Sequence, residues 1–343
     1  MISLQDKIEA VSNIFPLNLD STTLINNNIG ENAALYRVNT ENVRILSSSQ
    51  IRETYIIDSI AGGEIACHPY LVGEALKKKC IEASGAFQKA LQALDLYSDL
   101  SILHILRGAS GYMVPEVLPP ETPLLSIRTE YQEDGYRSHS DDSRRLEVTF
   151  RNYSTKKIST LIIPDTYATG RSAETGINDL ITHGLKPKRV ILYGFIATPS
   201  LQRLSQLCQQ HEIELISFGI CNITPLAHNN YDMPIYGLDE SYYTKTRKIR
   251  YLGCIIPSET LERLLPEYVA GMDQAGDWSE RHHQLFNGNG NENGNIMGHL
   301  KKSQHLIQIL DNLNSQQKWY TELHREIANT TLNKINDEMN KYS

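Results

Sequence analysis

Short apolar runs alternate with longer amphipathic stretches through the middle of the chain. Residues 161–163, 190–197 and 213–219 are apolar runs, rich in branched side chains and of the length of a buried strand. Stretches in which apolar residues recur at helical spacing follow the first two runs, at 173–184 and 201–207. This alternation predicts an α/β fold, with a parallel sheet flanked by helices.

The pattern before residue 161 predicts further elements of the same kind. Residues 67–95 follow helical spacing, and a His-Pro pair near their start suits a first helical turn. Residues 103–106 and 124–127 read as strands, and they are followed at once by Arg107 and Arg128. Ligands of parallel sheets bind at the carboxyl ends of the strands. The Gly- and Ser-containing loop after residue 106 has the shape of a phosphate loop, and a surface arginine at a strand end is the alternative for Arg107.

The two ends of the chain differ from this middle part. Residues 1–50 alternate short apolar pieces with Asn and Ser, and we treat them as an N-terminal extension of a domain over 51–286. The Asn- and Gly-rich run 287–298 is typical of a flexible linker. Residues 299–343 carry apolar residues near heptad spacing and predict a helical tail. The tail packs on the body or on a second subunit, and a coiled coil is the alternative.

Composition bounds the class of protein. The chain has 343 residues, of which 40% are hydrophobic and 21% charged, as in soluble globular proteins. A net charge of −7 argues against a nucleic-acid surface, and no apolar run approaches the roughly 20 residues that span a bilayer. The N-terminus lacks a signal-peptide pattern, and five well-separated cysteines suggest free thiols. We therefore expect a cytoplasmic protein with no nucleic-acid or membrane partner.

Residues 161–176, LIIPDTYATGRSAETG, hold the most informative chemistry. Asp165 stands where the strand should end, and a loop of mostly small residues and a helix follow. Backbone N–H groups converge at such a turn, and the helix dipole favours an anion. Asp165 can hold a sugar diol or position hydrated Mg²⁺. The alternative is an ordinary strand–helix turn whose residues only shape the loop. The loop residues in question are Ala168, Thr169, Gly170, Arg171 and Ser172.

This stretch resembles the motif of type I phosphoribosyltransferases that binds phosphoribosyl diphosphate (PRPP). It is most similar to the uracil phosphoribosyltransferase form, D-P-x-x-A-T-G-x-S-A. Residues 168–170, Ser172 and Ala173 match in place, whereas Pro164-Asp165 stand in reverse order. The strand ending in L-R-G-A-S-G is similar to the family's L-R-A-G-x-G, whose loop faces pyrophosphate. The family also has an arginine where Arg128 stands.

A second resemblance covers residues 268–278, YVAGMDQAGDW. It is similar to Y-I-x-P-G-L-G-D-A-G-D-R, the uracil-binding hood of the same family. Asp273-Gln274 replace G-D, and Trp278 replaces the closing arginine. Asp273 can fill the pocket, and Trp278 can stack on an aromatic ring or simply pack. PRPP recognition is therefore indicated more strongly than uracil recognition. The resemblance predicts substrate binding by Tyr268, Val269, Gly271, Asp273, Gln274, Ala275, Gly276 and Asp277.

The resemblance covers about residues 67–286 and implies a type I phosphoribosyltransferase fold with a small hood. It implies attack of a base nitrogen on C1 of PRPP, with Asp165, Arg107 and Arg128 as catalytic residues. Mg²⁺ is expected to bind through PRPP and, through water, Asp165 or Asp273. Residues 129–147 resemble the family's mobile lid hairpin. Within this lid the candidates to reach the ligand are Tyr136, Arg137, Arg144 and Arg145.

Three functions follow from these patterns. The first is a pyrimidine-salvage type of transferase with a uracil-like or other heterocyclic acceptor, assembled as a homodimer or higher homo-oligomer. The second is a non-catalytic PRPP or nucleotide sensor that works through the helical tail. The third is an assembly protein whose tail recruits a partner.

Overall fold

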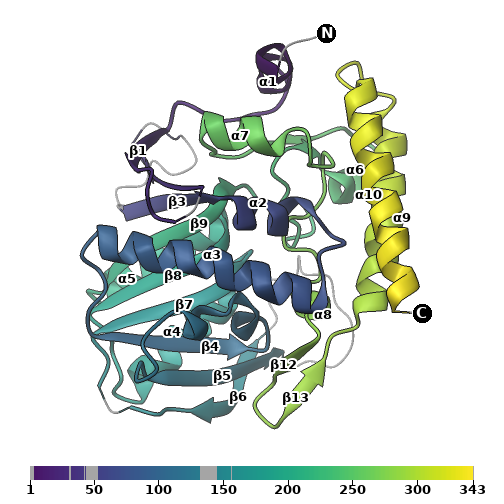
Figure 1. The fold of residues 1–343 in the computed structure, drawn as a ribbon. Helices are drawn as coiled ribbons and strands as arrows, with labels where there is room; N and C mark the ends of the chain where they lie inside the picture. The colour runs from purple at the N-terminus through teal and green to yellow at the C-terminus, as the bar shows by residue number, and fades with distance from the viewer. Residues whose placement is uncertain are drawn as a thin grey trace.

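The strands expected from the apolar runs pair in one large sheet in the computed structural model. The structure describes residues 4–30, 32–41, 43, 53–131, 145–155 and 157–342. Within them the sheet has nine strands (Figure 1). In spatial order these are β1 (Thr22–Asn26), β2 (Ala33–Val38), β3 (Glu53–Ser59), β9 (Glu214–Thr224), β8 (Arg189–Ala197), β7 (Thr160–Tyr167), β4 (Leu100–Leu106), β5 (Leu124–Tyr131) and β6 (Leu146–Asn152).

The sheet is mostly parallel. The six strands from β3 to β5 run parallel. The outer strands β1 and β2 on one side and β6 on the other are added to this sheet in antiparallel fashion. Helices α2 (Ile60–Cys67) and α3 (Gly73–Ala93) cover one face, and α4 (Arg171–Thr182) and α5 (Thr198–Gln210) cover the other (Figure 1). The predicted α/β fold with a parallel sheet flanked by helices is confirmed.

Both faces of the central strands are buried, which explains their continuous apolar runs. In β7, Ile162 packs into the cluster under α2 and α3, whereas Leu161 and Ile163 pack into the cluster under α4 and α5. All three side chains are completely buried. A strand buried on both sides cannot show the alternation of polar and apolar residues that marks a half-exposed strand.

The helix expected over 67–95 begins later than predicted. Helix α2 ends at Cys67, and α3 begins only at Gly73. His68 still donates its backbone N–H to Glu64 O at 3.0 Å, but Pro69 has no N–H to continue the ladder. The prediction of one helix in this range is confirmed, but its start at His68-Pro69 was wrong, because these residues lie in the connection between α2 and α3.

The N-terminal segment is part of the sheet. Strands β1 and β2 extend it beside β3, and α1 (Leu4–Ser12) packs against α7 (Ser258–Leu264). The boundary that we placed at residue 50 therefore falls between two neighbouring strands of one sheet.

The Asn- and Gly-rich run is not a flexible linker in the structure. Strands β12 (Gln284–Phe286) and β13 (Asn291–Asn293) form a hairpin (Figure 1). The Asn287 side-chain carbonyl accepts from the N–H groups of Asn289, at 2.9 Å, and Gly290, at 3.1 Å. Asparagine closes turns in this way, so a composition that is typical of linkers here specifies a tight turn.

The tail consists of two helices lying side by side, α9 (Ile296–Asn314) and α10 (Glu322–Lys341) (Figure 1). The continuous helix expected over 299–340 is interrupted because Thr321 and His324 form a capping box that begins α10. Leu300, Ile307 and Leu310 of α9 are completely buried in the main core cluster. Of the predicted alternatives, packing on the body is the one that the structure shows.

Shorter elements connect these layers. None of the helices among the described residues combines the length and apolar character needed to cross a bilayer. The lid candidates Tyr136, Arg137 and Arg144 lie outside the described residues, and Arg145 directly precedes β6. The remaining elements are η1 (Gly108–Tyr112), η2 (Val114–Glu116), β10 (Gly237–Leu238), α6 (Glu240–Thr246), β11 (Tyr251–Leu252) and α8 (Trp278–Arg281).

Candidate functional site

The candidate site lies where the neighbouring strands β4 and β7 diverge and stop pairing. Their pairing ends at Ile102 and Ile162. Pro164 lies beyond this last pair, where its missing N–H costs no bond to β4. The 3₁₀ helix η1 fills the gap, and the hydroxyls of Tyr112 and Thr166 are 2.6 Å apart. Diverging carboxyl ends of parallel strands are the usual place for a ligand in such folds.

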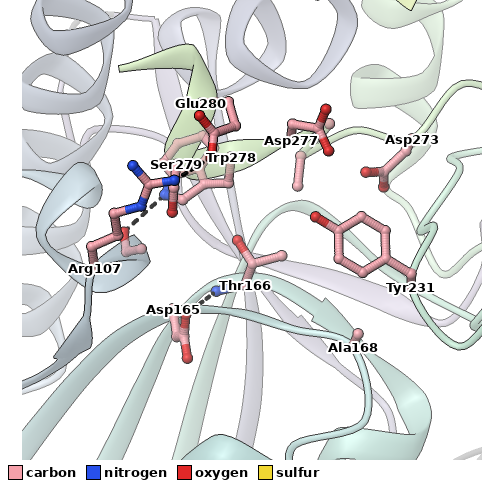
Figure 2. Close-up of a pocket in the computed structure, with 13 residues that line it drawn as sticks. Arg107, Asp165, Thr166, Ala168, Tyr231, Asp273, Asp277, Trp278, Ser279 and Glu280 are labelled. Carbon is pink, nitrogen blue, oxygen red and sulfur yellow. Dashed lines mark hydrogen bonds and ion pairs between the residues drawn. The ribbon is translucent and has the colours of Figure 1, made fainter. Parts of the chain in front are cut away.

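Two adjoining pockets open at these strand ends. The first, here called the loop pocket, has a volume of about 350 Å³ and includes residues 168–173 in its lining. The second, the hood pocket, has a volume of about 330 Å³ and includes residues 275–280 in its lining. Figure 2 shows the hood pocket. Both pockets are lined by Arg107, Gly108, Asp165, Thr166, Ala168, Tyr231 and Ser279.

The loop pocket contains all five predicted loop residues, 168–172. Gly170 precedes α4 with φ +78°, and a Cβ there would lie 3.1 Å from the Cα of Ser200. Glycine is therefore the residue that lets the chain turn into the helix at this point. Arg203 donates to the Thr169 carbonyl at 2.9 Å and fixes the loop from behind. The N-terminus of a twelve-residue helix thus faces an open cavity, an arrangement that favours an anion.

Asp165 lines both pockets. Its carboxylate accepts from the Thr166 N–H at 2.8 Å (Figure 2). Burial raises the pKa of Asp165 to about 7, partly opposed by this hydrogen bond. The neighbouring strand comes unusually close, because a Cβ on Gly194 would lie 1.9 Å from the Asp165 carbonyl oxygen. The exchange of Pro164 and Asp165 relative to the family motif leaves the acid facing the pockets.

Arg107 also lines both pockets, but its guanidinium is already occupied. It pairs with Glu280, and its Nη1 lies 3.2 Å from Glu292 Oε1. The same nitrogen lies 3.5 Å from the Asn293 carbonyl oxygen. Figure 2 shows the Glu280 carboxylate above the arginine. Arg107 is therefore placed at the predicted site, with protein acceptors where a ligand anion was expected.

Arg128 lines neither pocket. Its Nε lies 2.8 Å from Glu130 Oε1, and its Nη1 donates to the Asn287 carbonyl at 3.3 Å. Of the two predicted arginines, only Arg107 lines the described pockets, and a shared ligand for both stays a prediction. The Arg128 contact with Asn287 belongs to the β12–β13 hairpin, which the sequence pattern did not reveal.

Four of the predicted hood residues line the hood pocket: Asp273, Ala275, Gly276 and Asp277. Asp273 accepts from the Met233 N–H at 2.8 Å, and burial raises the pKa of its carboxyl well above the usual value. Asp277 pairs with Lys302 of α9 at 2.9 Å. The tail helix thus contributes directly to the charge balance of the hood.

The other four predicted hood residues belong to the scaffold: Tyr268, Val269, Gly271 and Gln274 line neither pocket. The Tyr268 hydroxyl accepts from the Ile235 N–H at 3.0 Å. The Gln274 amide nitrogen donates to the Met233 carbonyl at 2.7 Å. In this structure their polar groups have partners inside the protein, as buried polar groups usually do. Their assignment as substrate contacts stays a prediction.

Several lining residues were not among the predicted ones: Thr166, Tyr231, Ser279 and Glu280. Ser279 and Glu280 directly follow the hood motif, and that adjacency was the available signal. Tyr231 belongs to no recognised motif, and its hydroxyl points into the hood pocket (Figure 2). Trp278 mainly packs: its Nε1 donates to the Gly108 carbonyl at 3.0 Å, and its ring lies 4.5 Å from that of Tyr112.

A buried arginine holds the hood in place. Arg281 is only 1% exposed, and burial lowers the pKa of its guanidinium to about 10. Such a burial is tolerated because its N–H groups find acceptors. These acceptors are the backbone carbonyls of Ile65, His68, Leu71, Gln274 and Ala275.

The described residues contain no group of three His, Cys, Asp or Glu side chains placed to hold a metal ion by themselves. Of the two predicted acids, Asp165 is the better match for a hydrated cation, because it faces both pockets. Asp273 already accepts a backbone hydrogen bond, and burial favours its neutral form.

No protein-family model and no curated protein matches the chain. Solved structures similar to it include the AQ2163 protein from Aquifex aeolicus, with 15% identity over 52% of this chain and 91% of that one and a TM-score of 0.40. Adenine phosphoribosyl transferase from Trypanosoma brucei, in complex with AMP, pyrophosphate and ribose-5-phosphate, is 12% identical over 52% and 85%, with a TM-score of 0.34. Orotate phosphoribosyltransferase from Mycobacterium tuberculosis, in complex with PRPP, is 12% identical over 47% and 90%, with a TM-score of 0.28.

Proposed function

We propose that this chain transfers ribose 5-phosphate from PRPP to a nitrogen of a heterocyclic acceptor and releases pyrophosphate. One observation carries the proposal. The N-terminus of α4 and the loop 168–172 face a cavity that also contains Asp165, and a second cavity adjoins it at the hood. An activated phosphosugar and a flat acceptor need two such compartments with a shared border.

Each compartment has a distinct role in this proposal. The loop binds the 5′-phosphate through backbone N–H groups, and Asp165 accepts hydrogen bonds from the ribose diol. The acceptor lies in the hood pocket. Its nitrogen forms a bond to C1 as the bond from C1 to the diphosphate oxygen breaks. The pyrophosphate leaves with that electron pair and takes up the proton that the nitrogen loses. The site contributes chiefly position and electrostatic stabilisation.

Mg²⁺ is the cofactor that the proposal implies. Asp165 would hold the hydrated ion, and oxygens of PRPP would supply further ligands, because Mg²⁺ prefers hard oxygen donors and retains water. When bound, the ion neutralises charge on the diphosphate as it leaves.

Uracil is the acceptor that the family resemblance suggests, yet the pocket is better matched to a base that donates hydrogen bonds. Four carboxyl groups line the hood pocket, those of Asp165, Asp273, Asp277 and Glu280 (Figure 2). Carboxylates accept hydrogen bonds, so exocyclic amino groups are the expected partners. The acceptor panel should therefore pair cytosine with uracil, and adenine with hypoxanthine.

Pyrophosphate release tests the proposal. The protein is incubated with PRPP, Mg²⁺ and each acceptor, and the nucleotide product is identified by mass. We expect turnover with at least one acceptor and none with Asp165→Ala. PRPP binding without pyrophosphate release for any acceptor would contradict the transferase proposal.

A non-catalytic binding protein for PRPP or nucleotides is the second candidate. The observation that favours it is the pairing of Arg107 with Glu280 and Glu292, which leaves the leaving-group side of the site with protein carboxylates. Calorimetric titration with PRPP and nucleoside monophosphates, combined with the absence of turnover, would support this candidate.

A further inference from the structure

We propose that Glu280 and Glu292 determine ligand selectivity by occupying Arg107, so that the site binds ribose 5-phosphate groups more readily than PRPP. The inference rests on the proposed function, because it assigns the loop pocket to a 5′-phosphate. It concerns a different part of the ligand, the diphosphate on C1.

The guanidinium of Arg107 is already paired with two carboxylates. Its side chain is 17% exposed, and both terminal nitrogens have carboxylate partners, Glu280 and Glu292. Two carboxylates around one guanidinium leave a local charge of about −1. An arriving diphosphate would have to displace at least one of them, since all three anions use the same planar donors.

Both carboxylates are held in place by a second hydrogen bond. Glu280 Oε2 accepts from the N–H of Asn295 at 2.6 Å, at the start of α9. Glu292 Oε2 accepts from the side-chain amide of Asn287 at 3.2 Å. Each acid thus has a second partner that orients it toward Arg107 and lowers the entropy lost in the pairing.

The hairpin that carries Glu292 is anchored to β6. Phe286 of β12 contacts Phe150 of β6 edge-to-face, with ring centroids 6.4 Å apart. The backbone at Gly288 approaches the same ring so closely that a Cβ would lie 2.9 Å from it. The carbonyl of Asn287 accepts from Arg128. The hairpin therefore engages both arginines that the sequence assigned to pyrophosphate.

The loop pocket does not share this competition. Residues 168–172 include no acidic side chain. Arg203 donates to the Thr169 carbonyl and pairs with Glu174, and the Arg171 guanidinium lies over the Tyr131 ring, 5.8 Å from its centroid. A ligand that carries only the 5′-phosphate meets backbone N–H groups and the helix dipole. Selectivity then arises because the 5′-phosphate subsite is ready for its anion and the diphosphate subsite holds two of its own.

The test compares PRPP with ribose 5-phosphate in calorimetric titrations at matched Mg²⁺ concentration. The variant is Glu280→Gln with Glu292→Gln, since glutamine keeps the shape and an acceptor oxygen for Asn295 and Asn287. We expect PRPP and inorganic pyrophosphate to bind about tenfold tighter or more, and ribose 5-phosphate to change by less than about twofold. The matched control is Glu322→Gln with Glu338→Gln on α10, which changes net charge equally and should leave all affinities unchanged.

Three outcomes separate the possibilities. Equal gains for PRPP and ribose 5-phosphate, or no gain for PRPP, would overturn the selectivity inference and leave the proposed function standing. Failure of the unmodified protein to bind either ligand would instead overturn the proposed function. Thermal unfolding checks that the double variant is folded, and the single Glu292→Gln variant replaces it if it is not, with the same expected direction.

Discussion

Asp165 lies half-buried at the carboxyl end of β7, between the two pockets. Burial raises its pKa to about 7, and the one N–H that it accepts, from Thr166, opposes that shift only in part. Its carboxyl therefore changes charge close to neutral pH, where a metal ion or a sugar diol would favour the ionised form.

The raised pKa makes a prediction for stability. Between about pH 4 and about pH 7 the unfolded chain has Asp165 ionised while the folded chain keeps the proton, so stability falls as pH rises through this window. We expect Asp165→Asn to be more stable than the unmodified protein above pH 7, by about 1–4 kcal/mol, with the difference shrinking toward about pH 4. Urea unfolding at the two pH values measures it. A difference that does not depend on pH would contradict the assigned pKa.

Gly170 allows a second prediction, because the chain provides a matched control. Gly184, after α4, has φ +76°, similar to the φ +78° of Gly170, but a Cβ at Gly184 would meet no atom within 4 Å. Alanine at either position should cost about 1 kcal/mol through the backbone alone. We expect Gly170→Ala also to weaken ribose 5-phosphate binding about tenfold or more, because the loop must shift away from Ser200. Gly184→Ala should leave that affinity unchanged. Equal affinities for the two variants would argue against phosphate binding at this loop.

At the scale of elements, α9 packs directly on the hood. Leu310 is completely buried and lies against Gly271, where a Cβ would be only 2.8 Å from its side chain. Asn314 donates to the Ala270 carbonyl at 2.9 Å. The hood motif therefore packs under the tail, which explains why Gly271 serves the scaffold.

Truncation of Leu310 measures this contact. We expect Leu310→Ala to lower the free energy of unfolding by about 2–5 kcal/mol, since a buried leucine leaves a cavity. Leu306→Ala on the same helix should cost less, because that side chain is only partly buried. Denaturant unfolding compares the two variants. Equal losses would mean that the hood contact is not specific.

Buried elements could be predicted from the sequence, whereas the polar β12–β13 hairpin could not. Strands β7, β8 and β9 were predicted because strands buried on both faces are apolar throughout. The β12–β13 hairpin was missed because its sequence is polar, and its turn depends on the Asn287 side chain accepting from the backbone. Composition alone cannot distinguish such a turn from a linker.

At the scale of the molecule, one core joins the body and the tail. The main apolar cluster contains residues of α2, α3, the hood, α9 and α10. Arg281 adds backbone hydrogen bonds between the hood and the connection from α2 to α3. We therefore propose that body and tail unfold together.

Removal of residues 296–343 tests this proposal. The full chain should show a single calorimetric transition, and the shortened chain should lose cooperative unfolding, because the partners of Leu300, Ile307 and Leu310 become exposed. A shortened chain that unfolds at the same temperature as the full one would contradict a shared core.

Assembly as a homodimer or higher homo-oligomer remains a prediction. The edge strand β1 supports it, since Leu24 and Ile25 are 50% and 44% exposed there and open strand edges readily pair with another chain. Sedimentation velocity measures the mass. A monomer at micromolar concentration would contradict the prediction.

The sequence by itself determined the parallel α/β layers and the loop at the start of α4. These features depend on local chemistry: buried strands must be apolar, and a turn into a helix at positive φ requires glycine. It also singled out Arg107, Asp165, Asp273 and Asp277, which line one pocket in the structure. Only the tertiary structure decided what these side chains contact. Arg107 pairs with Glu280 and Glu292 because a hairpin and a helix, more than 170 residues further along the chain, pack against η1, which directly follows Arg107. No local pattern encodes that contact, because it depends on how distant elements pack.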